Sequence, residues 1–159
     1  MIKNLLLPFL GVIAFIVIVG VFFQKTQNTN PGQVQKTVTI ASKAINVEVA
    51  DTPAERAQGL SGRSSLAADS GMLFVFETKA VTPIFWMKDM LIPLDFIWIG
   101  GGRVVRIDKN VPFPAPGTPD ANLKTYTAGE PIDYVLEVNG GFSDTNSIKV
   151  GDPVTLSGI

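Results

Sequence analysis

The chain has 159 residues, of which 13 are basic and 14 acidic, and it contains neither cysteine nor histidine. The absence of both residue types excludes thiolate nucleophiles, disulfides, imidazole general bases and zinc or copper sites with the usual ligands. No stretch has the pattern of a calcium-binding loop, so we expect no metal site and no cofactor. The balanced charge gives no basic surface for a phosphate backbone, and we do not expect nucleic acid as a partner.

Residues Leu5 to Phe23 form an apolar run without any charged or hydrogen-bonding side chain. As a helix this run extends roughly 28 Å, close to the ~30 Å hydrocarbon core of a bilayer. A secretory signal has a shorter apolar region and a small-x-small cleavage site, whereas this run is followed directly by Gln24 and Lys25. We therefore expect residues 1–25 to be an uncleaved, single-pass anchor in the membrane bilayer; a cleaved signal and a buried helix are the alternatives.

The orientation of this anchor rests on few charges. Lys3 precedes the apolar run and Lys25 follows it, so the positive-inside bias is weak and favours a cytoplasmic amino terminus. Residues 26–36 are polar and predict a flexible tether. The sequence thus predicts a single domain, residues 37–159, that faces outward, toward the periplasm or the cell exterior.

The first elements of this domain have clear local patterns. Apolar and polar residues alternate in residues 38–40 and again in 45–49, which is typical of half-buried strands. The segment Thr52-Pro53-Ala54-Glu55 has the pattern of a capping box with proline at the first helical position. It predicts a short helix, which Gly59 and Gly62 limit to about two turns.

The later elements indicate more strands. Residues 72–76 and 92–99 are nearly continuous apolar runs, typical of strands covered on both faces. Three glycines at 100–102 predict a hairpin, and four prolines within 111–120 indicate a long surface loop. Further strands are expected at 134–138 and 148–156. The pattern predicts a mainly β domain with one short helix, closed as a β-sandwich, a jelly roll or a barrel.

Five phrases of the sequence occur in an order that is typical of one protein family. They are Glu55-Arg56-Ala57-Gln58-Gly59-Leu60-Ser61-Gly62-Arg63, Gly71-Met72-Leu73-Phe74-Val75-Phe76, Phe85-Trp86-Met87-Lys88-Asp89-Met90-Leu91-Ile92-Pro93-Leu94-Asp95, Tyr134-Val135-Leu136-Glu137 and Gly151-Asp152. Over roughly residues 38–156 the chain resembles the bacterial and archaeal family known as domain of unknown function 192. The resemblance implies a compact, mainly β domain of sandwich or jelly-roll type, often exported behind a signal or an anchor, with no established biochemical activity.

The chain departs from this family in two places. Asp89-Met90 stands where family members usually have Asn-Thr, and residues 112–125 lack the cysteine that many members have in this loop. A metal or redox role based on that cysteine does not transfer to this chain.

Asp95 and Glu137 are the carboxylates that the pattern places inside apolar strands. A buried carboxylate needs donors or a cationic partner, so we expect Asp95 to bond an arginine or backbone N–H groups, and Glu137 to accept bonds from an arginine or the backbone. Arg56, Arg63 and Lys88 are the nearest cationic candidates. The alternatives are a polar cluster that contacts a ligand, and a glycosidase-like pair in which both carboxyls meet in one cleft.

Aromatic and charged residues predict a binding surface. We expect Trp98 in the core and Trp86 at an exposed rim. The candidate surface consists of Arg56, Arg63, Trp86, Lys88 and Asp89 with the proline-rich loop 111–125, and Asp95 and Glu137 complete the candidate site residues. The alternative is that the arginines brace the helix and the prolines stiffen the loop.

These patterns favour a membrane-anchored, extracytoplasmic module that binds an envelope glycan or a protein, rather than an enzyme. The rival hypothesis is a carboxylate-based hydrolase that acts on envelope glycan through Asp95 and Glu137. The two hypotheses differ in whether these carboxyls face one open cleft.

Overall fold

The computed structural model describes residues 35–159, so the predicted anchor and most of the predicted tether lie outside the described residues. Among the described residues no helix is long and apolar enough to cross a membrane. The elements in chain order are β1 (Thr37–Ile40), β2 (Lys43–Ala50), α2 (Pro53–Gln58), β3 (Ser70–Val75), β4 (Phe85–Trp86), β5 (Leu94–Gly100), β6 (Arg103–Val111), the 3-10 turn η1 (Asp120–Asn122), β7 (Thr125–Tyr126), β8 (Tyr134–Asn139), α3 (Phe142–Thr145) and β9 (Val154–Ser157).

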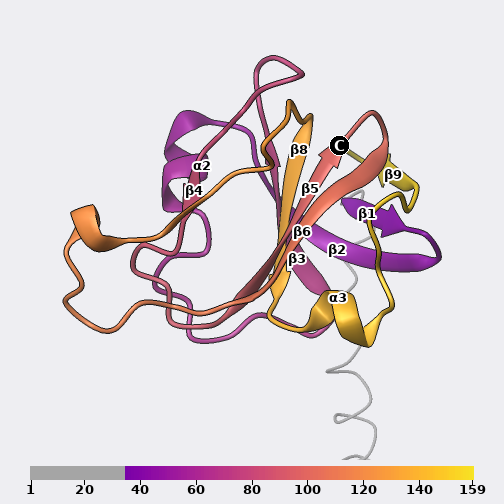
Figure 1. The fold of residues 1–159 in the computed structure, drawn as a ribbon. Coiled ribbons are helices and arrows are strands. Elements are labelled where there is room, and N and C mark those ends of the chain that lie inside the picture. Colours follow the sequence, from indigo (N-terminus) through magenta and orange to yellow (C-terminus); the bar gives the residue numbers. More distant parts are fainter. Residues whose placement is uncertain (1–34) are drawn as a thin grey trace, which may run out of the picture. The chain divides into compact units, whose positions relative to one another are not determined.

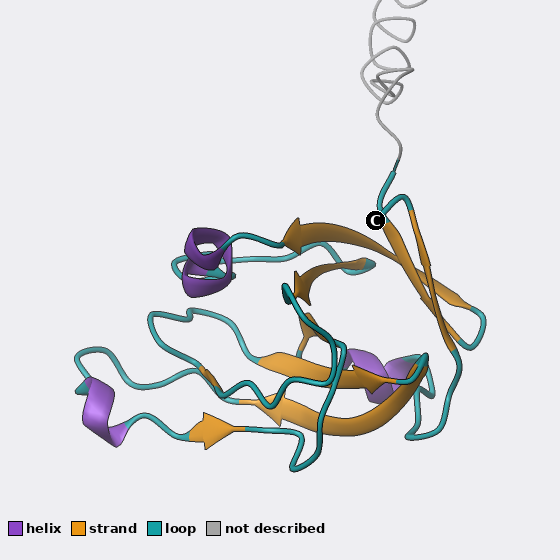
Figure 2. Cartoon of the chain, turned by 90° about the horizontal axis from the view of Figure 1, so that it is seen from above, coloured by secondary structure: helices purple, strands orange, loops and turns teal. Residues whose placement is uncertain are grey.

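Seven strands form one curled sheet in the order β6-β5-β8-β3-β2-β1-β9, in which only β2 and β3 run parallel (Figures 1 and 2). Its two edges approach each other, because the Val104 N–H donates to Asp152 O at 3.0 Å and the Val154 N–H to Gly102 O at 2.9 Å. Strands β4 and β7 pair separately. The prediction of a mainly β domain is confirmed, and its closure is a single sheet curled into a half-barrel.

The predicted capping box is present at the start of α2. The Glu55 N–H donates to Thr52 Oγ1 at 3.2 Å, and the Thr52 N–H donates to Glu55 Oε2 at 3.0 Å. Gly59 ends the helix with a φ of 49°, in the left-handed region that glycine tolerates. A second short helix, α3, and the pair β4–β7 were not predicted.

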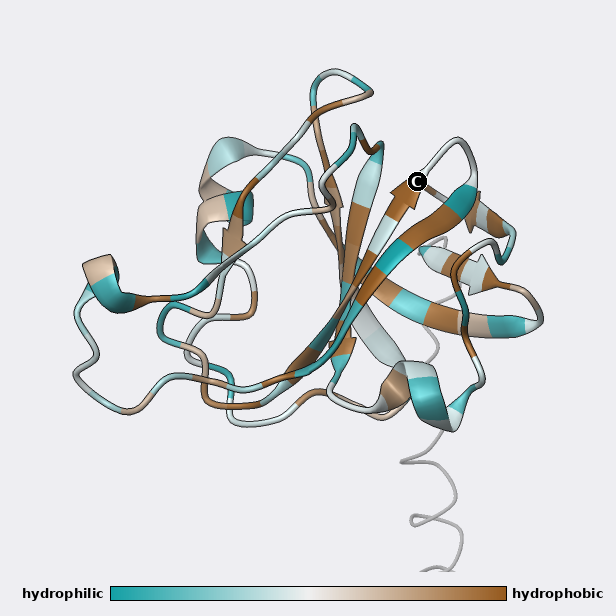
Figure 3. Ribbon diagram, in the orientation of Figure 1, coloured by the Kyte–Doolittle hydropathy of each residue, from teal (hydrophilic) through white to brown (hydrophobic). Residues whose placement is uncertain are grey.

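Hydrophobic residues are concentrated in the strands of the curled sheet (Figure 3), and their side chains form one core on each of its faces. On β5, Leu94, Phe96 and Trp98 face the segments around α2, β4 and β7, as the prediction for Trp98 requires. The alternate residues Ile97 and Ile99 face the inside of the curl, which β1, β9 and α3 complete. A side chain's position along a strand therefore decides which of the two cores it enters.

Candidate functional site

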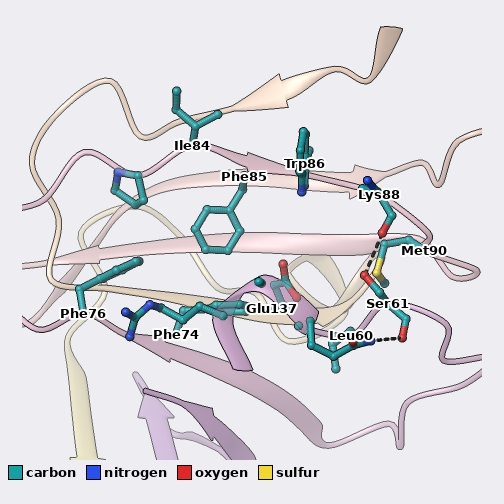
Figure 4. Close-up of a pocket in the computed structure, with 15 residues that line it drawn as sticks. Leu60, Ser61, Phe74, Phe76, Ile84, Phe85, Trp86, Lys88, Met90 and Glu137 are labelled. Atoms are coloured by element: carbon teal, nitrogen blue, oxygen red, sulfur yellow. Dashed lines mark hydrogen bonds between the residues drawn. The ribbon is translucent and has the colours of Figure 1, made fainter. Parts of the chain in front are cut away.

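A cavity of about 330 Å³ opens between α2 and β4, on the outer face of the curled sheet (Figure 4). The carboxyl of Glu137, on β8, lies at its floor, between Phe85 on one side and Leu60 on the other. Its walls are largely aromatic and aliphatic. The residues that line it include Arg56, Leu60, Phe74, Phe85, Trp86 and Glu137.

The Glu137 carboxyl is buried, and one of its two oxygens has no polar partner within residues 35–159. Only 5% of the residue is exposed, and Oε2 has no hydrogen-bond partner among the described residues. Its neighbours across the sheet, Met72 on β3 and Phe96 on β5, are apolar. Burial raises the pKa of the Glu137 carboxyl to about 8, so the group is protonated at neutral pH. The prediction that an arginine or the backbone satisfies this carboxyl is wrong for Oε2.

Asp95 lies on the other face of the sheet and is fully satisfied by backbone groups. Oδ1 accepts the N–H groups of Asn110 at 2.7 Å and Gly141 at 2.8 Å, and Oδ2 accepts that of Ser143 at 2.7 Å. The prediction that backbone N–H groups bond Asp95 is thus confirmed, and the prediction of an arginine partner is wrong. Asp95 ties β5 to the end of β6 and to the first turn of α3, and its role is structural.

The registers of β5 and β8 separate the two carboxylates. Asp95 lies opposite Val138, and Phe96 lies opposite Glu137. Directly opposed residues share a face of a sheet and successive residues alternate, so Asp95 and Glu137 point to opposite faces. The predicted glycosidase-like pair is therefore wrong.

Arg56 lines the cavity, but its guanidinium is engaged elsewhere. Nη1 donates to the carbonyl oxygen of Asp51, which follows β2, and to that of Val75, at the end of β3, the latter at 2.9 Å. Nη2 lies 3.9 Å from Oε1 of the exposed Glu77. These bonds hold α2 against the sheet, as the bracing alternative predicts.

Arg63 does not line the cavity. Its two terminal nitrogens donate to the two carboxylate oxygens of Glu48 at 2.5 and 2.7 Å. This pairing lowers the pKa of Glu48 and raises that of Arg63. The contact fastens the segment after α2 to β2, and Arg63 is a brace.

Replacing Arg63 by alanine should lower the free energy of unfolding by about 0.5–1 kcal/mol, because half-exposed ion pairs contribute no more. Urea unfolding of Arg63→Ala, Glu48→Ala and the double variant measures the coupling between the two side chains. Each single change should cost about as much as both together. Losses that simply add would contradict the assignment of this pair as the brace.

Trp86, Lys88 and Asp89 surround the mouth of the cavity. Trp86 is 47% exposed, as predicted for a rim residue. The Lys88 ammonium lies 5.7 Å from the centroid of the Trp86 ring and pairs with the Asp120 carboxylate at 2.5 Å. Asp89 lines a neighbouring hollow with Trp86 and Lys88. The mouth thus combines an aromatic surface with a lysine that is already paired with an acidic residue.

Of the seven candidate residues, Arg56, Trp86, Lys88 and Glu137 line one cavity, and Asp89 lies next to it. Arg63 and Asp95 do not belong to it. The proline-rich loop 111–125 lines separate hollows beside Lys88 and Tyr126. Among the described residues no group of three or more carboxylates is placed to hold a metal ion.

Comparison with known proteins places the domain in a family. The model of DUF192, described as Uncharacterized ACR, matches residues 34–156. The chain belongs to the DUF192 family. No curated protein matches it.

Two crystal structures resemble the DUF192 domain of this chain. One, from Sinorhizobium meliloti 1021, is of a protein named as a candidate transcription regulator; it is 29% identical over 78% of this chain and 95% of that one, with a TM-score of 0.67. The other, from Novosphingobium aromaticivorans DSM 12444, is of a protein of unknown function; it is 33% identical over 75% of this chain and 83% of that one, with a TM-score of 0.66.

Asp89 forms part of a turn at the mouth of the cavity. Its φ is 55°, and its carbonyl accepts the Gly62 N–H at 2.8 Å. Asparagine and aspartate are the side chains that best tolerate a left-handed φ. An aspartate is therefore well suited to this turn.

The sequence did not reveal the cavity wall as part of a site. Leu60, Phe74, Phe85 and Met90 line it. Their apolar character predicts core packing, and they do pack against the core of the outer face. No local pattern indicates that space remains between them.

Proposed function

We propose that this protein is a membrane-anchored module that binds glycan of the cell envelope in the Glu137 cavity. The proposal rests on the Glu137 carboxyl, which lies at the floor of an aromatic-lined cavity. The residue is 5% exposed, and its Oε2 has no hydrogen-bond partner among the described residues. A buried polar group without a partner is costly, and a ligand that enters the cavity and forms a hydrogen bond with the carboxyl reduces this cost.

The size and lining of the cavity suit a sugar residue. Its volume of about 330 Å³ is at the lower end of the range of ligand sites, roughly 300–1,000 Å³. A sugar ring has one face of C–H groups and an edge of polar substituents. The exposed ring of Trp86 can take the apolar face while Glu137 takes a substituent.

Binding is favoured over hydrolysis by the position of Asp95. The rival mechanism requires two carboxyls that flank one glycosidic bond, and Asp95 faces the opposite side of the sheet. Nucleic acid binding is not favoured, because positions 35–159 contain 11 basic and 14 acidic residues.

Blocking the cavity should abolish glycan binding. Ala57 is exposed and lines the cavity, whereas Ala54 is exposed on the same helix and does not. In calorimetric titrations of the full chain in detergent with chitotriose and cellotriose, at least one trisaccharide should bind. Ala57→Trp should weaken that binding at least about tenfold, and Ala54→Trp should leave it unchanged.

Two outcomes would overturn this proposal: failure of both trisaccharides to bind, or equal binding by Ala57→Trp and the natural chain. Capture of a peptide ligand in place of either sugar would also count against a glycan module.

The anchor is tested separately, by fractionation of cells that express the full chain and mass spectrometry of the mature protein. Because Leu5 to Phe23 is long enough to span and lacks a cleavage site, the protein should remain in the membrane fraction and begin at residue 1 or 2. A soluble product that begins near Gln27 would contradict the anchor.

A further inference from the structure

The floor of the cavity offers a single unsatisfied hydrogen-bonding group. Gln58 Nε2 donates to Ser61 O at 3.2 Å, and Ser61 Oγ donates to Lys88 O at 2.9 Å (Figure 4). The Arg56 guanidinium donates to backbone carbonyl groups. Among the polar side chains that line the cavity, Glu137 is thus the one whose buried oxygen still lacks a partner.

The protonation of Glu137 decides what its carboxyl can bind. Burial raises its pKa to about 8, so at neutral pH it has one O–H donor and one carbonyl acceptor. The other charged groups that line the cavity are Arg56 on α2 and Lys88 after β4, and both are paired with acidic residues. The residues across the sheet, Met72 and Phe96, do not titrate.

A neutral donor in an apolar cavity is best matched by a neutral, strong acceptor that carries an apolar group. An additional hydroxyl beside Leu60, Phe74 or Phe85 would lose its bonds to water without replacement. An ammonium would require the carboxyl to lose its proton, and a carboxylate would itself be desolvated. An acetamido group has a carbonyl that accepts the O–H and a methyl group that packs on these side chains.

We infer that Glu137 recognises the acetamido group of a 2-acetamido sugar, whose carbonyl oxygen accepts a hydrogen bond from the Glu137 carboxyl. The sugar ring lies against the exposed surface of Trp86 at the mouth, and the acetyl methyl group enters the apolar part of the cavity. This inference rests on the proposed glycan-binding function and specifies which substituent of the sugar Glu137 recognises. It makes the protonated state of Glu137 the form that binds.

Trisaccharides that differ at one substituent test the inference by calorimetry on the full chain in detergent. Chitotriose carries acetamido groups, cellotriose carries hydroxyls in their place, and the glucosamine trimer carries amines. Near pH 6.5 chitotriose should bind at least about tenfold more tightly than the other two, because each leaves the floor donor unmatched. Above pH 8 its affinity should fall by about tenfold per pH unit as Glu137 ionises.

Two substitutions of Glu137 separate hydrogen bonding from shape. Glu137→Gln keeps an N–H donor, so chitotriose binding should stay within about threefold of the natural chain and lose its dependence on pH. Glu137→Leu removes the donor and should weaken binding at least about tenfold.

The possible contrary results distinguish failure of the acetamido inference from failure of the proposed glycan-binding function. Equal affinity for chitotriose and cellotriose, both blocked by Ala57→Trp, would overturn the acetamido inference and leave the glycan-binding function standing. Tighter binding of the glucosamine trimer as the pH rises would overturn it in favour of an amine ligand. Absence of binding by all three sugars would overturn the proposed function itself.

Discussion

Glu137→Gln should be more stable than the natural chain near pH 8 and equally stable near pH 4. The difference in the free energy of unfolding at pH 8 should be on the order of 4 kcal/mol. Chemical denaturation at a series of pH values measures it. This effect is as large as the loss expected for Asp95→Ala, but it is a gain in stability.

Glu137→Gln is expected to stabilise the protein because the folded and the unfolded chain hold the Glu137 proton over different pH ranges. Below the ordinary pKa of 4.5 the Glu137 carboxyl is protonated in the folded and the unfolded chain, and its titration contributes nothing. Between pH 4.5 and about 8 the unfolded chain releases the proton while the folded chain keeps it. Stability therefore falls by up to ~1.4 kcal/mol per pH unit across this window and levels off above it. Because glutamine does not titrate, the Glu137→Gln variant does not lose stability in this pH range.

A packing change on the same face provides the control. Met72 lies opposite Glu137 on β3, so Met72→Leu alters the packing there without removing a titrating group. Its effect on stability should be the same near pH 4 and near pH 8. If Glu137→Gln behaved in the same way, the raised pKa of Glu137 would be refuted.

Asp95→Ala should lower the free energy of unfolding by about 4 kcal/mol, a large share of the stability of a domain of this size. The substitution leaves the buried N–H groups of Asn110, Gly141 and Ser143 without their acceptor. Each such group costs about 1–3 kcal/mol. Thermal and urea unfolding measure the loss.

Two further variants check the reason for this loss. Asp95→Asn keeps one acceptor oxygen and should cost clearly less than alanine, about 1–2 kcal/mol. Asp69 is exposed, so Asp69→Ala should change the stability by less than about 0.5 kcal/mol. A melting temperature unchanged by Asp95→Ala would show that the three bonds do not hold β5, β6 and α3 together.

Local patterns were sufficient for most of the fold. The alternation in β1, β2 and β8, the capping box of α2 and the glycine hairpin between β5 and β6 each arise from neighbouring residues, and each is present. By contrast, α3 has four residues, and its first turn depends on Asp95, 48 positions before Ser143. The pair β4–β7 joins two-residue strands whose paired residues, Phe85 with Tyr126 and Trp86 with Thr125, are 41 and 39 positions apart. No local pattern indicates such contacts.

The site was predictable only residue by residue. Trp86 at a rim and Glu137 in an apolar strand follow from their sequence neighbours. Whether Asp95 and Glu137 share a face depends on the register between β5 and β8, which the sequence alone does not specify. The engagement of Arg56 with backbone carbonyls likewise depends on the position of α2 against β3.

The unsatisfied Glu137 carboxyl has a cost that an apolar residue at this position would avoid. Proteins commonly retain such groups where binding needs them, at the expense of stability. The gain in stability expected for Glu137→Gln and the loss of binding expected for Glu137→Leu are two consequences of the same buried donor.

The most direct measurement is a carbon-13 NMR titration of the Glu137 side-chain carboxyl in the full chain, with and without chitotriose. We predict a protonated carboxyl at neutral pH, a midpoint near pH 8 for the protein alone, and a higher midpoint when chitotriose is bound, because the ligand bonds the protonated form. A carboxyl that is ionised at neutral pH, or a titration midpoint that saturating chitotriose does not move, would contradict the role of protonated Glu137 in binding the sugar.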